Sequence, residues 1–195
     1  MLNKIILASK SKVRKKILDN NNIPNEVEHS NVDEDEIKKS LIRDKVTPDI
    51  ISKNLAELKA NKISLKRADQ LVLGADSVID LEGELISKPN NRQEAMMILK
   101  KLNGRKHYLV SSVCISKNGS MIWNFTDKAT LTMKNFSEDD LKKYLSKISD
   151  EALYAYNVYQ IEGEGKNLFS EIVGDKNTIM GLPIKQIREY LEILQ

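Results

Sequence analysis

Short apolar runs alternate along the chain with segments of helical spacing, and this pattern predicts a mixed α/β protein. The runs Lys4–Ala8 and Leu71–Leu73 are almost continuously apolar, as expected of strands buried on both faces. Alternating stretches joined by Asn118-Gly119 predict a long hairpin of strands 106–116 and 120–133. Apolar positions with helical spacing predict helices over residues 12–18, 48–63, 92–102, 137–148 and 183–194.

Three further strands are expected over 26–32, 156–161 and 168–173, with a loop over 174–183. The strands and helices interleave without repeats or low-complexity linkers. We therefore predict one domain over residues 1–195, an α/β or α+β body with a mixed sheet, flanking helices and two lobes around a cleft.

The segment LVLGADSVIDLEGELISKP, residues 71–89, is the best candidate for an active centre. Gly74 allows a close approach of the backbone to another element, and Asp76 is expected where the first strand ends. A hairpin then returns to Lys88, so an acid on one arm and a lysine on the other can face one cleft. Such a pair suits phosphate chemistry, and an ordinary hairpin with a solvated acid and lysine is the alternative.

A second candidate site follows the first predicted strand. Ser9 and Ser11 precede a helix start, where free backbone N–H groups, the helix dipole and serine hydroxyls can converge on a phosphate. Arg14 lies in the first turn and could add a bidentate contact. A serine cap followed by a solvated basic face remains the alternative, and the sequence contains no P-loop motif.

Acidic and basic side chains elsewhere leave two interpretations open. The acidic run 33–36 is either a favourable helix N-terminus or the source of a metal ligand opposite Asp76, because Mg²⁺ needs only one or two protein carboxylates. Lys59 flanks the apolar stripe of its predicted helix, where a lysine usually extends to the surface.

Composition excludes several classes of protein. The 195 residues are 41% hydrophobic and 30% charged with net charge +3, which gives no strong case for nucleic-acid binding. The apolar runs are far shorter than the ~20 residues of a membrane span, and no signal peptide is apparent, so a soluble cytoplasmic protein is expected. Cys114 is the single cysteine and is expected to be a buried filler, and His107 has no partner spaced for a metal site.

Five segments match one family in order along the chain. They are Leu7-Ala8-Ser9-Lys10-Ser11-x-x-Arg14, Val32-Asp33-Glu34, Leu55-Ala56-x-x-Lys59-Ala60, Gly74-Ala75-Asp76-Ser77-Val78 with Lys88-Pro89, and Gly181-Leu182-Pro183. On these motifs the chain resembles the Maf (septum-formation-inhibitor-like) nucleotide pyrophosphatases.

The resemblance implies an α/β fold similar to that of the inosine-triphosphate pyrophosphatases and often a homodimer. It implies hydrolysis of a nucleoside triphosphate to a monophosphate and pyrophosphate with a divalent metal, Mg²⁺ or Mn²⁺. Carried over by position, Asp76 becomes the catalytic base, and Glu34 joins it in binding the metal. The catalytic set also includes Lys59 and Lys88, and the triphosphate is held by these lysines together with Ser9, Ser11 and Arg14.

The same resemblance associates Val13, Ser77 and Glu162 with the choice of base. Members that prefer dTTP and UTP carry Arg, Thr and Gln there, whereas members acting on 7-methyl-GTP carry Glu at the last position. A carboxylate can accept both the N1–H and the 2-amino group of guanine, which favours a guanine-type or modified base. The expected substrates are therefore modified or non-standard nucleotides, either 7-methyl-GTP-like or dTTP/UTP-like. The chain departs from the family's A-G-x-Y turn at residues 156–159. A cell-division-associated binding protein with a vestigial pocket, and with the basic segment 10–16 as its footprint, is the alternative function.

Overall fold

The structure is a computed structural model that describes residues 2–195, with the backbone alone for residues 154–156. Within this range seven strands form one mixed sheet in the order β2-β1-β3-β5-β6-β7, with β4 also paired to β3. The strands are β1 (Ile5–Leu7), β2 (Asn25–Val27), β3 (Leu71–Leu81), β4 (Glu84–Ile86), β5 (Lys106–Lys117), β6 (Ser120–Met133) and β7 (Phe169–Val173). β1 pairs in parallel with β2 and β3, and the other pairs are antiparallel. The predicted mixed α/β architecture is confirmed.

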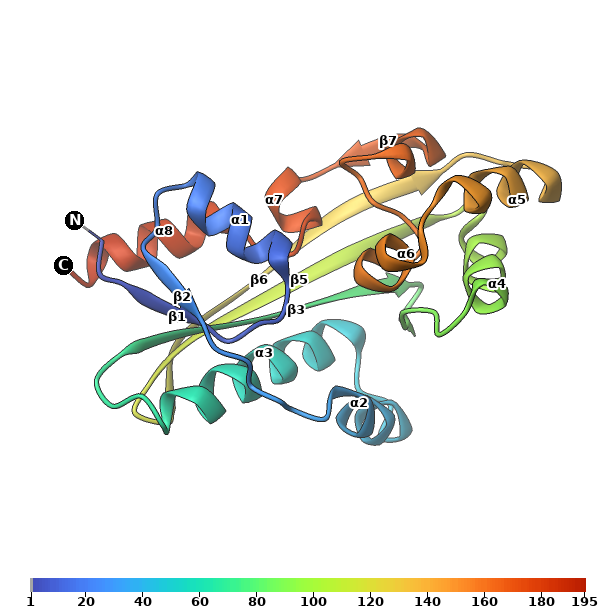
Figure 1. The fold of residues 1–195 in the computed structure, drawn as a ribbon. Helices are drawn as coiled ribbons and strands as arrows, with labels where there is room; N and C mark the ends of the chain where they lie inside the picture. Colours follow the sequence, from blue (N-terminus) through green and yellow to red (C-terminus); the bar gives the residue numbers. More distant parts are fainter. Residues whose placement is uncertain (1) are drawn as a thin grey trace.

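Helices cover both faces of this sheet (Figure 1). They are α1 (Lys12–Asn20), α2 (Glu34–Arg43), α3 (Pro48–Ser64), α4 (Arg92–Leu102), α5 (Glu138–Lys147), α6 (Asp150–Tyr156), α7 (Lys176–Ile179) and α8 (Ile184–Ile193), with a 3₁₀ helix at Glu164–Leu168. Local sequence explains several starts: Ser11 caps α1, and Ser137 forms a capping box with Asp140 at α5. The five predicted helices are confirmed within two residues at either end.

Alternation along β1 shows why this strand is apolar at every position. Ile5 and Leu7 pack with α1 and α8 on one face, whereas Ile6 and Ala8 pack with α3 on the other. β3 follows the same rule, because Leu73 belongs to the α1/α8 face and Val72 to the α3 face. Side chains at neighbouring positions of β3 therefore point to opposite faces of the sheet, one covered by α3 and the other by α1 and α8.

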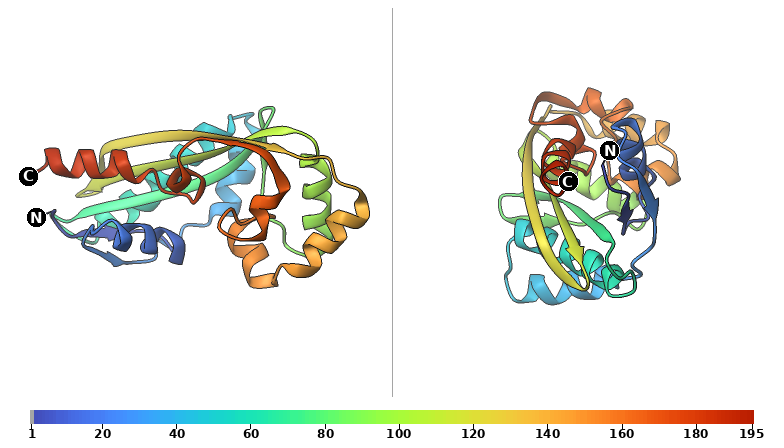
Figure 2. Two further views of the ribbon diagram at one scale, coloured as in Figure 1. Left: turned by 90° about the horizontal axis from the view of Figure 1, so that it is seen from above. Right: turned by 90° about the vertical axis from the view of Figure 1, so that its left-hand side faces the viewer.

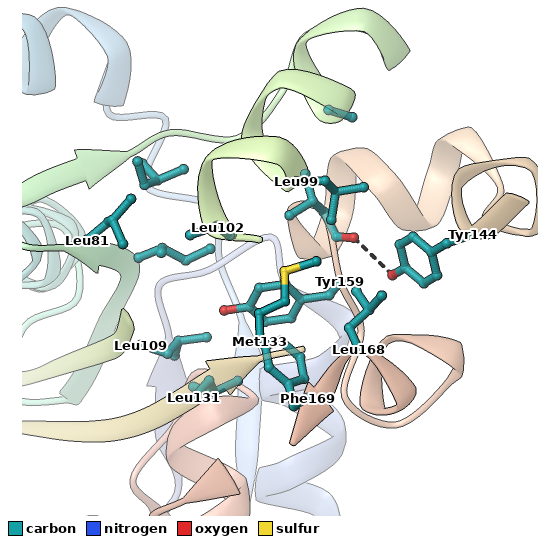
Figure 3. Close-up of a cluster of buried hydrophobic side chains, with 14 of the residues drawn as sticks. Leu81, Leu99, Leu102, Leu109, Leu131, Met133, Tyr144, Tyr159, Leu168 and Phe169 are labelled. Carbon is teal, nitrogen blue, oxygen red and sulfur yellow. Dashed lines mark hydrogen bonds between the residues drawn. The ribbon is translucent and has the colours of Figure 1, made fainter. Parts of the chain in front are cut away.

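Two hydrophobic clusters lie toward opposite ends of the elongated sheet, which gives the predicted two lobes (Figure 2). One contains residues of β1, α1 and α8, and the other contains residues of α4 and α5 together with Leu153, Val158, Tyr159, Leu168 and Phe169. In the second cluster Tyr144 donates a hydrogen bond of 2.9 Å to the carbonyl of Val158 (Figure 3). No described helix has the length and apolar character needed to cross a membrane.

Some sequence predictions were wrong. The strand expected over 156–161 is the end of α6 followed by turns, because Ser149 caps a helix whose acidic first turn the apolar pattern did not reveal. Asn157 then ends α6 with a positive φ of 67°. The strand expected over 26–32 pairs only through Val27, since β1 also ends there, and the loop 174–183 contains the short helix α7.

Cys114 is buried as predicted, and the structure shows that His107 is buried as well. Cys114 is fully buried, and burial raises the pKa of its thiol to about 11, which makes it an inert filler. His107 is also fully buried, and its Nε2 lies 3.0 Å from the hydroxyl of Tyr159. Burial lowers the pKa of His107 to about 4, so the imidazole is neutral at pH 7.

Candidate active site

The candidate site lies along a part of β3 that lacks a neighbouring strand on one edge. β5 pairs with residues 72–80 along the other edge. On the site edge, β1 pairs with residues 71–73 and β4 with residues 79–81, so 74–78 face no strand in the part of the chain that the structure describes. Asp76 therefore sits in the middle of a continuous strand, not at a strand's end as predicted; the element that ends beside it is β1.

Gly74 brings α3 close to this open edge. A Cβ atom at residue 74 would lie 2.1 Å from the carbonyl oxygen of Ala56 and 2.8 Å from the backbone nitrogen of Ala60. Only glycine permits this approach, as the sequence indicated. Lys59 lies between these two contacts on α3, so the glycine determines where the lysine can reach.

Asp76, Lys59 and Glu34 form a contiguous charged group on the α3 face. Lys59 Nζ lies 2.8 Å from Asp76 Oδ1 and 2.9 Å from Glu34 Oε1. Lys59 and Asp76 are only 5% and 4% exposed, so the surface-lysine interpretation of Lys59 is wrong. Burial raises the pKa of Glu34, yet the attraction and hydrogen bond of Lys59 outweigh it and hold that pKa below its ordinary value. Glu34 is the first residue of α2, which confirms that the acidic run forms a helix N-terminus, and it also forms an ion pair with Lys59.

Arg14 occupies the opposite face of the same open edge. Its guanidinium donates to the carbonyls of Gly181 (3.0 Å) and Ala75 (2.9 Å). It also donates to the hydroxyls of Ser9 (3.3 Å) and Ser77 (3.0 Å). These four bonds use four of its five N–H groups, so in this arrangement Arg14 offers a phosphate one donor and not the predicted bidentate fork. Burial lowers its pKa, and the charges of Asp76 and Glu34 oppose that shift.

A buried hydroxyl chain fixes the Ser77 end of this arrangement. Ser111 Oγ donates 2.7 Å to the carbonyl of Thr178, so in its contact with Ser77 Oγ at 2.9 Å it must accept. Ser77 therefore accepts from Arg14 and donates to Ser111. Ser111 was missed by sequence analysis because the serines of this strand carry no local signal that separates a site residue from a buried structural hydroxyl.

The pKa of Lys88 responds to the charges of Glu34 and Asp76. Burial lowers its pKa, as do Arg14 and Lys38, whereas Glu34 and Asp76 raise it. Lys38 is a further cation that sequence analysis missed, 3.8 Å from Glu34. Its i,i+4 spacing from Glu34 on a helix was the available signal.

One cleft of about 690 Å³ contains this whole arrangement. All ten sequence-predicted site residues line it: Ser9, Ser11, Val13, Arg14, Glu34, Lys59, Asp76, Ser77, Lys88 and Glu162. Glu162 lies in the turns after α6, and its partly exposed carboxylate is 4.0 Å from Lys176. Asn157 lines the cleft as well, whereas the side chain of Tyr156 lies outside the described residues.

The acids have the chemistry of a hard-cation site. Asp76 Oδ2 is buried and has no hydrogen-bond partner among the described residues. A buried carboxylate oxygen that accepts no hydrogen bond destabilises the folded protein unless a bound ligand interacts with it. No group of three or more His, Cys, Asp or Glu side chains that could hold a metal ion occurs in the described part of the chain.

The fold is a mixed α/β sheet with helices on both faces, and its cleft gathers lysine, arginine and serine side chains that suit an anionic ligand. The family model described as Maf-like protein matches residues 4–194, and the chain therefore belongs to the Maf family of nucleoside triphosphate pyrophosphatases.

Comparison with individual proteins gives the same family. The chain is 69% identical over 195 residues to a nucleoside triphosphate pyrophosphatase of Pelagibacter ubique, with 100% of both chains covered. It is 34% identical over 184 residues to a 7-methyl-GTP pyrophosphatase of Rhizobium etli, covering 94% of this chain and 92% of that protein. Among solved structures, the Staphylococcus aureus Ham1 protein aligns with 99% of this chain and 100% of its own at a TM-score of 0.44 and 15% identity.

Proposed function

We propose that this protein hydrolyses a guanine-type nucleoside triphosphate, normal or methylated, to the monophosphate and pyrophosphate with a divalent metal at Asp76 and Glu34. The observation that carries the proposal is the contact of the buried Lys59 with both acids, beside an Asp76 oxygen that has no described partner. Fixed cations, a carboxylate near the attack position and a roomy cleft are the parts that this reaction needs.

The mechanism follows from the charges. Attack of water at the α-phosphorus displaces pyrophosphate, so negative charge grows on several phosphate oxygens at once. Arg14, Lys59 and Lys88 stabilise that charge, and the Ser9–Ser11 segment at the start of α1 adds hydroxyl and backbone donors. Asp76 orients the water and accepts its proton. Mg²⁺ or Mn²⁺, when bound by Asp76 and Glu34, supplies Lewis-acid stabilisation of the phosphate oxygens.

Glu162 supports the proposal of a guanine-type base. Its carboxylate lines the cleft, and it can accept two donors from the guanine edge, whereas uracil offers one. The relative from Rhizobium etli, named 7-methyl-GTP pyrophosphatase, is consistent with this choice. Val13 and Ser77 match neither pattern of the family, so dTTP and UTP remain the competing substrates.

The test measures pyrophosphate release with Mg²⁺ from normal and modified nucleoside triphosphates. We expect GTP or 7-methyl-GTP to exceed dTTP and UTP, and we expect Asp76→Asn to lose about 10³-fold or more in kcat/KM. Asp80→Asn is the matched control, because Asp80 is a buried acid of the same strand that accepts from Gly83 N outside the cleft. Release of orthophosphate alone, or an active Asp76→Asn variant, would reject the proposal.

Assembly and location complete the proposal. We propose one domain over residues 1–195 that acts in the cytoplasm, as the composition indicates, and as a homodimer, as the family resemblance implies. Light scattering on the eluting protein should give twice the chain mass of 22.2 kDa, and a monomeric mass rejects the dimer. A binding-only role predicts instead that affinity for a partner survives Asp76→Asn, while the pyrophosphatase activity is absent in both forms.

A further inference from the structure

Lys59 bridges the two acids to which the proposed function assigns the metal. Its ammonium group is within 3 Å of one oxygen of Asp76 and one of Glu34, and the lysine is 5% exposed. The buried charge of Lys59 thus compensates the buried carboxylate of Asp76 and also pairs with Glu34, whose side chain is 40% exposed.

We propose that Lys59 is an internal counter-ion that keeps the divalent metal out of the empty site, so that the metal enters together with the triphosphate. The proposal rests on the proposed function and assigns the order in which its components bind. Lys59 then has two positions: on the acids when the cleft is empty, and on a phosphate oxygen when the nucleotide is bound.

The environment of Asp76 is the first support. Its Oδ1 already accepts from Lys59, and its Oδ2 is buried, as is most of the residue. An ion from solvent cannot reach Oδ2 until a neighbouring group moves. Lys59 is the neighbour with a long, unbranched side chain, whereas the backbone around Asp76 is fixed by β5 and by the hydrogen bond from Ser52 Oγ to its carbonyl.

The charge of the cleft is the second support. Six cationic and four anionic side chains of the described residues line it, so a free dication meets a positive site while a triphosphate is attracted. Binding of the triphosphate supplies new anionic partners for Lys59 and leaves Asp76 and Glu34 available as metal ligands. The nucleotide therefore draws Lys59 off the two acids, and the metal that is bound to its phosphates can then reach them.

The experiment measures binding of Mn²⁺ alone, by the electron paramagnetic resonance signal of the free ion, without nucleotide and without turnover. We expect Lys59→Met and Lys59→Gln to bind Mn²⁺ at least about tenfold more tightly than the wild-type protein, because an adjacent positive charge is gone. Lys59→Arg keeps the charge and should bind as weakly as the wild type. Lys38→Met is the matched control, because Lys38 pairs with Glu34 at 3.8 Å and should change Mn²⁺ affinity by less than about threefold.

The outcomes separate cleanly. Equal Mn²⁺ affinity of the wild-type protein and both neutral variants overturns the proposal, and so does an equal gain in Lys38→Met, which would reflect general cleft charge. Circular dichroism confirms that each variant is folded before its affinity is used. Two neutral variants, Met and Gln, are made so that the test does not depend on the folding of one of them. Failure here with intact pyrophosphate release in the wild type rejects the binding order alone, whereas absence of pyrophosphate release rejects the proposed function.

Discussion

Replacing Gly74 with alanine tests how the site is assembled, since no atom of residue 74 touches substrate in the proposed mechanism. The new methyl group would lie 2.1 Å from the carbonyl oxygen of Ala56 and 2.8 Å from the nitrogen of Ala60. Both are backbone atoms of α3, so no side-chain rotation relieves the contact. The helix must move away from β3 by about 1 Å or more to restore van der Waals separation.

The expected magnitude follows from that displacement. Overpacking of a rigid interface costs about 3 kcal/mol, and for a chain of this size that lowers the melting temperature by roughly 6–12 °C. Lys59 moves with α3, so its 2.8 Å contact with Asp76 opens. A misplacement of that size in an active site lowers kcat/KM by about 100-fold.

The assay combines calorimetry with pyrophosphate release at a temperature where the variant is folded. Gly83→Ala is the control, because Gly83 has φ +86° in a turn and a Cβ there meets nothing within 4 Å. That variant should lose about 1 kcal/mol through its positive φ and keep wild-type kcat/KM. Wild-type stability and activity of Gly74→Ala would refute the role of Gly74 in placing Lys59.

Three further predictions test other parts of the molecule. Ser111→Ala removes the acceptor that orients Ser77 toward Arg14, and we expect KM for the triphosphate to rise about tenfold at a cost of about 1–2 kcal/mol in the free energy of unfolding. Ser116→Ala, which removes another buried β5 hydroxyl bonded to Asn61, should lose similar stability with KM unchanged, and equal KM values in both variants contradict the prediction. Glu162→Gln should lower kcat/KM for guanine nucleotides about tenfold relative to UTP, measured by pyrophosphate release, and an unchanged ratio removes Glu162 from base selection. Finally, the pKa of His107 falls from its ordinary 6.5 to about 4 in the folded state, so the unfolded chain binds more protons between these values. Stability is thus fully present above pH 6.5 and declines as pH falls toward 4, by on the order of 3 kcal/mol. Urea titrations should show this loss in the wild type and not in His107→Asn, and persistence of the full loss in that variant assigns it to other groups.

The sequence predicted the long elements because their signals are local. Apolar spacing and capping residues identified α3, α4 and α5, and Asn118-Gly119 identified the β5–β6 hairpin. The strand predicted over 156–161 was wrong because its local signal is weak. That segment is short, α6 reaches its first residue, and Asn157 then adopts a φ of 67° that a β-strand does not have.

The site residues could be identified from local motifs, whereas their contacts could not. Ser9, Arg14, Glu34, Lys59 and Asp76 were nominated by motif, and the structure places them in one cleft. Their protonation environment, the shared position of Lys59 and the saturation of the Arg14 donors could not be predicted, since each depends on atoms contributed by segments far apart in the chain.

By itself the sequence determined the class of fold, the family and the list of groups available for chemistry. The tertiary structure alone decided that β1 and β4 leave a gap along β3, and that alternate residues at this gap face two different helices. Asp76 meets Lys59 on one face and Ser77 meets Arg14 on the other. The reason is physical: residue type and local spacing are written in the chain, whereas the distance between two charges depends on how every intervening element packs.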